Sequence, residues 1–285
     1  MNKLFSLFRN ERGIQVDAYY VQGESPKLST YYPFIRFINK PVMIYYFVNP
    51  LCKQCWSVEV AIKKLTMKYG TFFNLRPIIS HSFTHPFQQN GKQLSQWHHY
   101  HLSVGIKAAG LQGNKAGRDF LRNIQETIFL YESSASVIDI IHQAAKHSGL
   151  DMHEFQKDLY SDVAIKAYQG DIQLIQEMDV NQFPTFVFSS QHIEDHSIKV
   201  SGSQSYETYE YVLKKMLKVK PKTFQQNIPP LEVYLSNFPR VRADEIAFIY
   251  ITIKEAIKKL KKLQLKRKMK KVDINNKTVW EYQRK

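Results

Sequence analysis

The amino-acid sequence predicts an α/β fold in which a sheet is interrupted by an all-helical insertion and followed by a small, basic helical region. An apolar segment at 42–48, a helical pattern and a second strand at 72–79 occur in the order of a βαβ unit. Residues 93–178 have helical periodicity, and strand-like segments return after them. The C-terminal region is rich in lysine.

The length and composition support a globular protein of one elaborated domain or one domain with an appendage. The chain has 285 residues, of which 44% are hydrophobic, so it can bury a sizeable core. We expect a weakly structured leader (1–40), a main domain (41–220) with the helical insert at about 93–178, a linker (221–242) and a basic tail (243–285).

The first predicted unit is a strand, a helix and a second strand. Val42–Val48 is continuously apolar and rich in β-formers, which is typical of a strand buried on both faces. Cys52–Tyr69 has apolar side chains spaced by four and three residues, as on one face of a helix, and Gly70 closes it. The strand at 72–79 follows, and the helical crossover requires the two strands to be parallel.

Strand character returns after the insert, at 184–188 and 198–200, and a helix is predicted over about 206–217. Prolines between 221 and 230 mark the linker. In the tail we expect a helix that opens at Ala243, a second helix, and a hairpin around Asn275–Asn276, an arrangement similar to a winged helix. The second helix is expected to present an apolar stripe made of Ile253, Ile257 and Leu260.

The charge of the chain is +15 and is concentrated near its C-terminus. Lys254–Lys271 contains ten Lys or Arg residues against one acid, Glu255, which indicates an acidic partner. A basic helix and a hairpin could lie along nucleic-acid phosphates, but any solvated amphipathic helix shows the same pattern. We expect an acidic protein rather than nucleic acid, and no membrane, since no apolar run reaches about 18 residues.

Only two cysteines occur in the chain, Cys52 and Cys55. A single pair three positions apart cannot build the disulfide framework of a secreted domain, so we expect the pair to serve its reactivity or to be a relic of it. The apolar stretch after Met1 is broken early by Arg9 and Glu11 and is too short for a secretion signal. We therefore expect a cytoplasmic protein.

The placement of the pair at a strand-to-helix junction is typical of reactive thiols. The free amides and positive dipole end of a helix stabilise the thiolate of Cys52 and lower its pKa, which makes Cys52 the nucleophile and Cys55 the resolving thiol. A zinc site would need further ligands from histidine, and the candidates form no convincing array. These candidates are His81, His85, His98, His99 and His101. We expect no metal and no cofactor.

The segment Phe183-Pro184-Thr185 is the third candidate part of this site. An isolated proline at the start of a strand is usually a trans residue at a sheet edge. The position of Pro184, after an insertion that follows a Cys-x-x-Cys unit, favours a cis Phe183–Pro184 bond instead.

These motifs resemble a known branch of the thioredoxin superfamily. Asn49-Pro50-Leu51-Cys52-Lys53-Gln54-Cys55-Trp56 resembles the opening of DsbA-like proteins of the FrnE type. Phe183-Pro184-Thr185 resembles their cis-proline loop, and Gly202-Ser203-Gln204-Ser205 resembles the turn before their last helix. The resemblance implies a thioredoxin-like (DsbA-like) fold over 42–218, helical insert included.

Within that branch the chain resembles the SpxH (YjbH) family. The resemblance runs through residues 47–56, 63–70 and 227–232 and the lysine-rich tail. It implies an adaptor that binds the transcription factor Spx and presents it to ClpX within the ClpXP protease. Some members open with a Cys/His-rich head, which this chain lacks because its first cysteine is Cys52 and its first histidine is His81.

The resemblance leaves the use of the thiol pair open. Other relatives have lost one cysteine, which implies that the adaptor role does not need thiol exchange. The alternative function is that of a cytoplasmic thiol-disulfide oxidoreductase or isomerase, in which Cys52 attacks, Cys55 resolves and Pro184 shapes the substrate groove.

Overall fold

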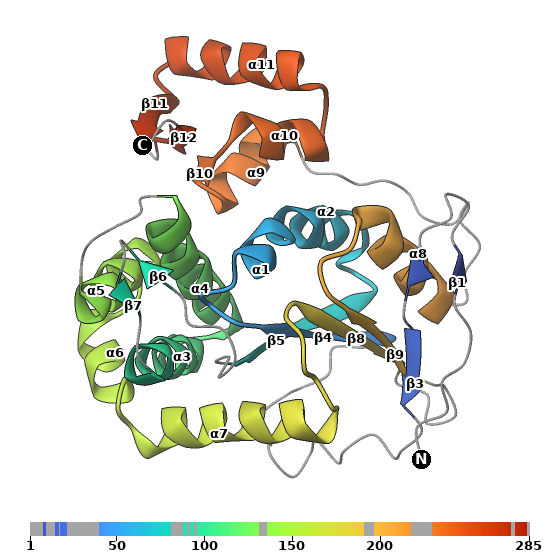
Figure 1. Cartoon of the computed structure of the whole chain (residues 1–285). Helices are drawn as coiled ribbons and strands as arrows, with labels where there is room; N and C mark the ends of the chain where they lie inside the picture. Colours follow the sequence, from blue (N-terminus) through green and yellow to red (C-terminus); the bar gives the residue numbers. More distant parts are fainter. Residues whose placement is uncertain are drawn as a thin grey trace. The chain divides into compact units, whose positions relative to one another are not determined.

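The computed structural model describes residues 8–9, 15–16, 18–21, 40–80, 88–89, 92–93, 96–130, 136–190, 197–217, 230–274 and 277–283. The chain divides into two compact units, which are described separately below (Figure 1). Unit 1 comprises Met1–Val58 and Thr71–Pro221. Unit 2 comprises Glu59–Gly70 and Lys222–Lys285, so it is built from two segments far apart in the sequence.

Unit 1 is organised around a five-stranded sheet with the strand order β3-β9-β8-β4-β5. Its strands are β3 (Ala18–Val21), β4 (Val42–Val48), β5 (Phe73–Ile79), β8 (Thr185–Ser190) and β9 (Ser197–Ser201). Strands β4 and β5 are parallel and the other pairs are antiparallel, as the βαβ prediction requires for the first two. All but one residue of β4 is buried, so the continuous apolar run is explained by coverage of both faces.

Strand β3 lies within the segment expected to be a weakly structured leader. It pairs with β9, with Ala18 opposite Val200 and Val21 opposite Ser197. Aromatic and β-branched residues favour an extended backbone, and pairing with β9 satisfies the hydrogen bonds that β9 would otherwise leave open on that side. The described residues of unit 1 also form two short antiparallel pairs: β1 (Phe8–Arg9) with β2 (Gln15–Val16), and β6 (Gln88–Gln89) with β7 (Lys92–Gln93).

The insertion is helical, as predicted, and is drawn in green to yellow in Figure 1. Its helices are α3 (Gln96–Leu111), α4 (Asn114–Phe129), α5 (Val137–His147), α6 (Met152–Asp158) and α7 (Asp162–Glu177). Side chains of Ser136, Asp151 and Ser161 cap the last three at their N-termini. Glycine is needed where α3 and α4 meet, because a Cβ on Gly117 would lie 3.1 Å from the Cα of Gly110. After the sheet resumes, α8 (Tyr206–Met216) ends the described part of unit 1.

The single helix predicted over Cys52–Tyr69 is divided into α1 (Lys53–Ser57) and α2 (Glu59–Tyr69). The carbonyl of Gln54 accepts from the Ser57 hydroxyl at 2.8 Å as well as from the Val58 amide at 3.2 Å. Such a side-chain bond to the backbone competes with the helical pattern, which accounts for the break between Ser57 and Glu59. Gly70 ends α2 because a Cβ there would collide with the Thr66 carbonyl.

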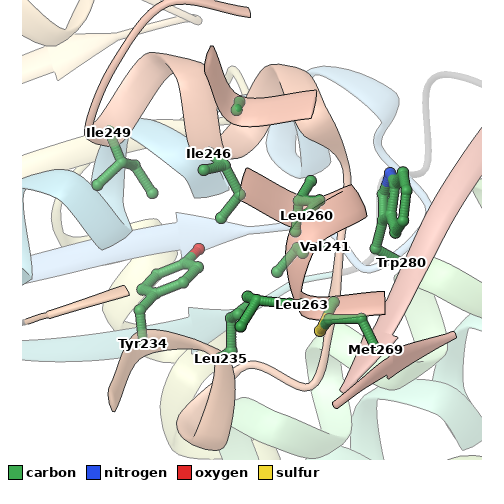
Figure 2. Close-up of a cluster of buried hydrophobic side chains, with 10 residues drawn as sticks. Tyr234, Leu235, Val241, Ile246, Ile249, Leu260, Leu263, Met269 and Trp280 are labelled. Atoms are coloured by element: carbon green, nitrogen blue, oxygen red, sulfur yellow. The ribbon is translucent and has the colours of Figure 1, made fainter. Parts of the chain in front are cut away.

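Unit 2 combines α2 with a C-terminal helical region and a small antiparallel sheet of order β10-β12-β11. Its other elements are α9 (Leu231–Asn237), β10 (Arg240–Val241), α10 (Ala243–Ile249), α11 (Ile253–Leu265), β11 (Met269–Ile274) and β12 (Lys277–Tyr282). Figure 2 shows the buried apolar side chains that these elements bring together, among them Tyr234, Ile246, Leu260 and Trp280. Val60 and Met67 of α2 pack against the same cluster.

Helix α9 and strand β10 lie in the segment 221–242, which was expected from the sequence to be a linker. Leu231, Tyr234, Leu235 and Phe238 follow the helical spacing of three and four residues. Tyr234 and Leu235 are buried in the core of unit 2, and Leu231 and Phe238 pack against it. Tertiary burial therefore stabilises a helix too short to be stable alone.

Helix α11 presents a different apolar face from the predicted stripe. Its buried residues are Ala256, Leu260 and Leu263, whereas Ile253 and Ile257 are exposed. Only Leu260 of the predicted stripe is therefore in the core. A capping box holds the first turn, because Thr252 Oγ1 accepts from the Glu255 amide and the Glu255 carboxylate accepts from the Thr252 amide.

Candidate thiol site

The turn between β4 and α1 places Cys52 immediately before Lys53, the first residue of the helix. Asn49 is buried and shapes this turn: its side-chain Oδ1 accepts from the Leu51 amide at 2.9 Å, and its carbonyl accepts from the Cys52 amide at 3.0 Å. Cys52 is therefore the N-cap residue of α1, with an extended backbone. This is the position that the strand–Cys-x-x-Cys–helix order predicts.

The sulfur of Cys52 lies where it can hold a negative charge. Its Sγ accepts from the Cys55 amide at 3.2 Å, and Cys52 is a partly exposed residue. The pKa of Cys52 is lowered to about 7, first by a hydrogen bond from the Cys55 thiol and further by the amides of Cys55 and Gln54, against the opposing effect of burial. A substantial fraction of Cys52 is therefore thiolate at neutral pH.

Cys55 has the opposite character. Its side chain is fully buried, and burial raises its pKa well above the ordinary value, with the hydrogen bond to Cys52 acting in the same direction. Its carbonyl accepts from the Tyr46 hydroxyl at 2.9 Å, which ties the first turn of α1 to strand β4. The two thiols are thus divided into an accessible, acidic one and a sheltered, protonated one.

The Phe183–Pro184 peptide bond is cis, as the sequence predicts, and it lies beside the pair. The Phe183 carbonyl is 3.7 Å from Cys52 Sγ, within reach of the protonated thiol as a donor. Thr185 Oγ1 donates to the Gln182 carbonyl at 2.7 Å and closes the loop. The structure therefore brings together all three predicted site residues, Cys52, Cys55 and Pro184.

Gly202 supports this loop from the adjoining turn. It has a φ of +75°, and a Cβ there would lie 3.0 Å from Gln182 Nε2. Glycine therefore provides both the left-handed backbone and the space for the Gln182 side chain.

Several aromatic contacts that support the site were not predicted from the sequence. Trp56 stacks on Phe129 of α4, with ring centroids 5.5 Å apart, and Tyr46 stacks on Phe186 at 4.7 Å. Tyr209 packs on Phe186 at 4.6 Å, its hydroxyl accepts from the Gln204 amide at 3.0 Å, and burial raises its pKa to about 12. Tyr46 carries a signal in the sequence, because a tyrosine inside the apolar run Val42–Val48 is expected to be buried and its hydroxyl then needs a partner.

The histidines considered as metal ligands do not form a site in the described residues. His98, His99 and His101 lie on α3, whereas His81 and His85 fall outside the described residues. The ring centroids of Trp97 and His101 lie 3.9 Å apart. The pKa of His101 is lowered, mainly by burial and also by the nearby His98. Across the described ranges no group of three His, Cys, Asp or Glu side chains could hold a metal ion.

Within the same ranges, none of the helices combines the length and the apolar character needed to span a membrane.

Comparison with known proteins places these observations in context. The family model described as Thioredoxin matches residues 45–211. A crystal structure from Nitrosomonas europaea, described provisionally as a protein disulfide isomerase, aligns with a TM-score of 0.50 at 16% identity, covering 63% of this chain and 96% of the other. The predicted thioredoxin-like, DsbA-like fold is therefore confirmed. The chain is one of the thioredoxin-superfamily proteins that carry a Cys-x-x-Cys pair at the start of a helix.

Two relatives narrow the assignment. ClpXP adapter protein SpxH of Bacillus subtilis strain 168 is 38% identical over 269 residues, covering 85% of this chain and 89% of the relative. SpxH of Bacillus cereus strain ATCC 10987 is 37% identical over 273 residues, covering 86% and 91%. The chain belongs to the SpxH family of ClpXP adapter proteins.

Proposed function

We propose that this chain is an adaptor that binds Spx and promotes its degradation by ClpXP. The observation that carries the proposal is the similarity to SpxH proteins over 85% or more of this chain, which is too long a match to be confined to the thioredoxin-like domain. Fold alone would not select a function, since a thioredoxin-like domain hosts several. The adaptor acts in the cytoplasm, consistent with a chain whose only two cysteines are free thiols.

A reconstituted degradation reaction tests the proposal. Purified Spx is incubated with ClpXP and ATP, with and without this chain, and the half-life of Spx is measured. The expected result is a shorter half-life when the chain is present. An unchanged half-life, under conditions in which ClpXP degrades another known substrate, would overturn the adaptor function.

The thiol pair supports a second function, thiol-disulfide exchange. The Cys52 thiolate attacks one sulfur of a substrate disulfide, forms a mixed disulfide and releases the other substrate sulfur as a thiolate. Cys55, after losing its proton, then attacks Cys52 Sγ and releases the second substrate thiolate, which leaves the pair oxidised and the substrate reduced by two electrons. The observation that favours this function is the pKa of about 7 at Cys52 beside the cis Pro184 loop.

A double variant separates the two functions. Cys52→Ala with Cys55→Ala removes both sulfurs, and we expect it to stimulate Spx degradation as the natural chain does, because tethering needs no thiol. Loss of all stimulation in a variant that keeps its thermal stability would make thiol exchange the primary activity. Reduction of a disulfide-containing test protein by the natural chain, and not by the variant, would show that both activities coexist.

A further inference from the structure

The outer face of α11 carries an exposed apolar ridge beside a row of lysines. Ile253, Ile257, Lys261 and Leu265 are four residues apart and so form one continuous ridge along the helix. The side chains of Ile253, Ile257 and Leu265 are 50%, 37% and 87% exposed. Single exposed apolar residues are ordinary, but three aligned on one ridge of a well-capped helix form a surface that a partner can cover.

The lysine row lies next to this ridge. Lys254, Lys258 and Lys262 are again four residues apart, each one position beyond a member of the ridge, and all are exposed. Within the described chain none of the three makes a salt bridge to a carboxylate, whereas Lys268 pairs with Glu232 and Lys271 pairs with Asp273. Glu255, in the first turn of α11, lies near Lys258 and offsets part of its charge, and the rest of the positive field of this row is left for an external partner.

The opposite side of α11 packs against the core of unit 2. Ala256, Leu260 and Leu263 face the core of unit 2, and Figure 2 shows Leu260 and Leu263 directed toward that cluster. A helix that lies in a membrane surface inserts a wide apolar face, and here the wide face is occupied. A nucleic-acid backbone would engage the lysines but leave the apolar ridge in water. Neither occupant therefore matches both features.

We propose that the ridge Ile253–Ile257–Leu265 and the row Lys254–Lys258–Lys262 form a docking surface for an acidic amphipathic helix of a protein partner. The groove between the two rows accepts a ridge of such a helix. Its apolar side chains cover the isoleucines and Leu265, and its carboxylates pair with the lysines. The inference rests on the proposed adaptor function only for the identity of the partner, which would be Spx or ClpX.

A binding measurement on the full chain tests the surface without assuming the partner. The probe is a labelled peptide with leucine on one helical face and glutamate on its flanks, and the reference probe is a shuffled peptide of the same composition. Fluorescence anisotropy is recorded at about 0.1 M salt, where pairing between surface charges is still felt. We expect the helical peptide to bind roughly tenfold more tightly than the shuffled one.

Matched variants locate the binding. Lys258→Glu with Lys262→Glu should weaken binding of the helical peptide by roughly tenfold, whereas Lys146→Glu with Lys166→Glu makes the same charge change on α5 and α7 and should leave it nearly unchanged. Ile257→Ser with Leu265→Ser should also weaken it severalfold. Its control is Ile138→Ser with Val163→Ser, which alters exposed apolar residues of unit 1.

Three results would overturn the inference. The first is equal affinity for the helical and shuffled peptides, and the second is unchanged binding by the α11 variants. The third is tighter binding of duplex DNA or anionic vesicles than of the helical peptide at the same salt. Leu265→Ser alone keeps the test valid if the double variant unfolds, because Leu265 is 87% exposed and its loss leaves the core intact.

The degradation reaction connects the surface to the adaptor function. Lys258→Glu with Lys262→Glu is expected to slow Spx degradation severalfold relative to the natural chain and to the Lys146→Glu, Lys166→Glu control. If the natural chain stimulates degradation and the α11 variant stimulates it equally, the docking inference fails while the adaptor function stands. If the natural chain gives no stimulation, the adaptor function fails while the peptide measurements still decide the docking surface.

Discussion

The thiol site of unit 1 and the buried ion pair of unit 2 use polar groups in opposite ways. In unit 1 the partly exposed sulfur of Cys52 accepts from a helix amide and has a pKa of about 7, so a reactive atom stays available. In unit 2 the buried carboxylate of Glu245 accepts from Lys63 at 2.9 Å and from the Tyr234 hydroxyl, and Lys63 also lies over the Phe238 ring. Those charges satisfy one another inside the unit. The thiol site thus keeps a reactive atom accessible, whereas the Lys63–Glu245 pair is engaged within unit 2.

The largest expected effect is the loss of the buried carboxylate in unit 2. Glu245→Gln leaves the buried Lys63 ammonium without its closest counter-charge, and removing one partner of a buried pair costs about 3 to 5 kcal/mol. Urea denaturation followed by Trp280 fluorescence measures this loss, in a background where Trp56 and Trp97 are replaced by Phe. The control is Glu59→Gln, which removes the more exposed carboxylate 3.4 Å from Lys63 and should cost less than about 1 kcal/mol.

If both substitutions lower the free energy of unfolding equally, Glu245 is not the main counter-charge of Lys63. The proposed contrast between this buried ion pair and the thiol site would then be wrong.

The two faces of helix α11 can be compared in the same way, because one face is buried in unit 2 and the other is exposed. Leu260→Ala removes a fully buried side chain and should lower the free energy of unfolding by about 2 to 5 kcal/mol. Leu265→Ala removes a side chain that is mostly in water, and such surface substitutions usually change stability by less than about 0.5 kcal/mol. Thermal denaturation of both variants checks this. A comparable loss for Leu265→Ala would mean that unit 2 itself covers the ridge that we assign to a partner.

The thiol site is tested by its pH dependence. The thiolate is the reactive form, so the rate of Cys52 alkylation should rise with pH to a half-maximum near pH 7. The Cys55 thiol makes the largest contribution to this low pKa, and Cys55→Ala should therefore move the half-maximum toward the value of free cysteine, about 8.5. Mass spectrometry after timed iodoacetamide treatment gives the rates. A profile that does not move in Cys55→Ala would assign the acidity to the backbone amides alone.

The smallest expected effect concerns the tether between β4 and α1. Tyr46→Phe removes the hydroxyl that donates to the Cys55 carbonyl, and the loss of one such hydrogen bond costs about 1 kcal/mol. Tyr211→Phe removes an exposed hydroxyl and serves as the matched control, with no measurable cost expected. Chemical denaturation of the two variants compares them. Equal stabilities would show that water replaces the Tyr46 contact without penalty.

The elements that sequence reasoning located are those with a strong local signal. The run Val42–Val48 is apolar enough to indicate a central strand, and the position of the Cys-x-x-Cys pair at a strand-to-helix junction placed Cys52 at the start of the helix. Strand β3 and helix α9 were missed because each is short, and its stability comes from pairing or burial in the folded protein.

The parts of the site that sequence reasoning missed depend on distant contacts. Lys63 and Glu245 are 182 positions apart and are charged, so each would ordinarily be assigned to the surface. The prediction that Ile253 and Ile257 belong to the buried face of α11 was wrong for a related reason. Ile253 and Ile257 fit a helical period as well as Ala256 and Leu263 do, and only packing decides which face is buried.

The membership of α2 in unit 2 has a consequence for how the protein is made. As the ribosome releases the chain from its N-terminus, α2 appears early, whereas its partners Tyr234, Glu245 and Phe238 are added about 170 or more residues later, since 182 positions separate Lys63 from Glu245. The face of α2 that carries Val60 and Lys63 therefore waits without its final partners during most of synthesis. A nascent chain stopped before residue 230 would carry that face uncovered, which makes premature termination a direct route to aggregation and to capture by chaperones.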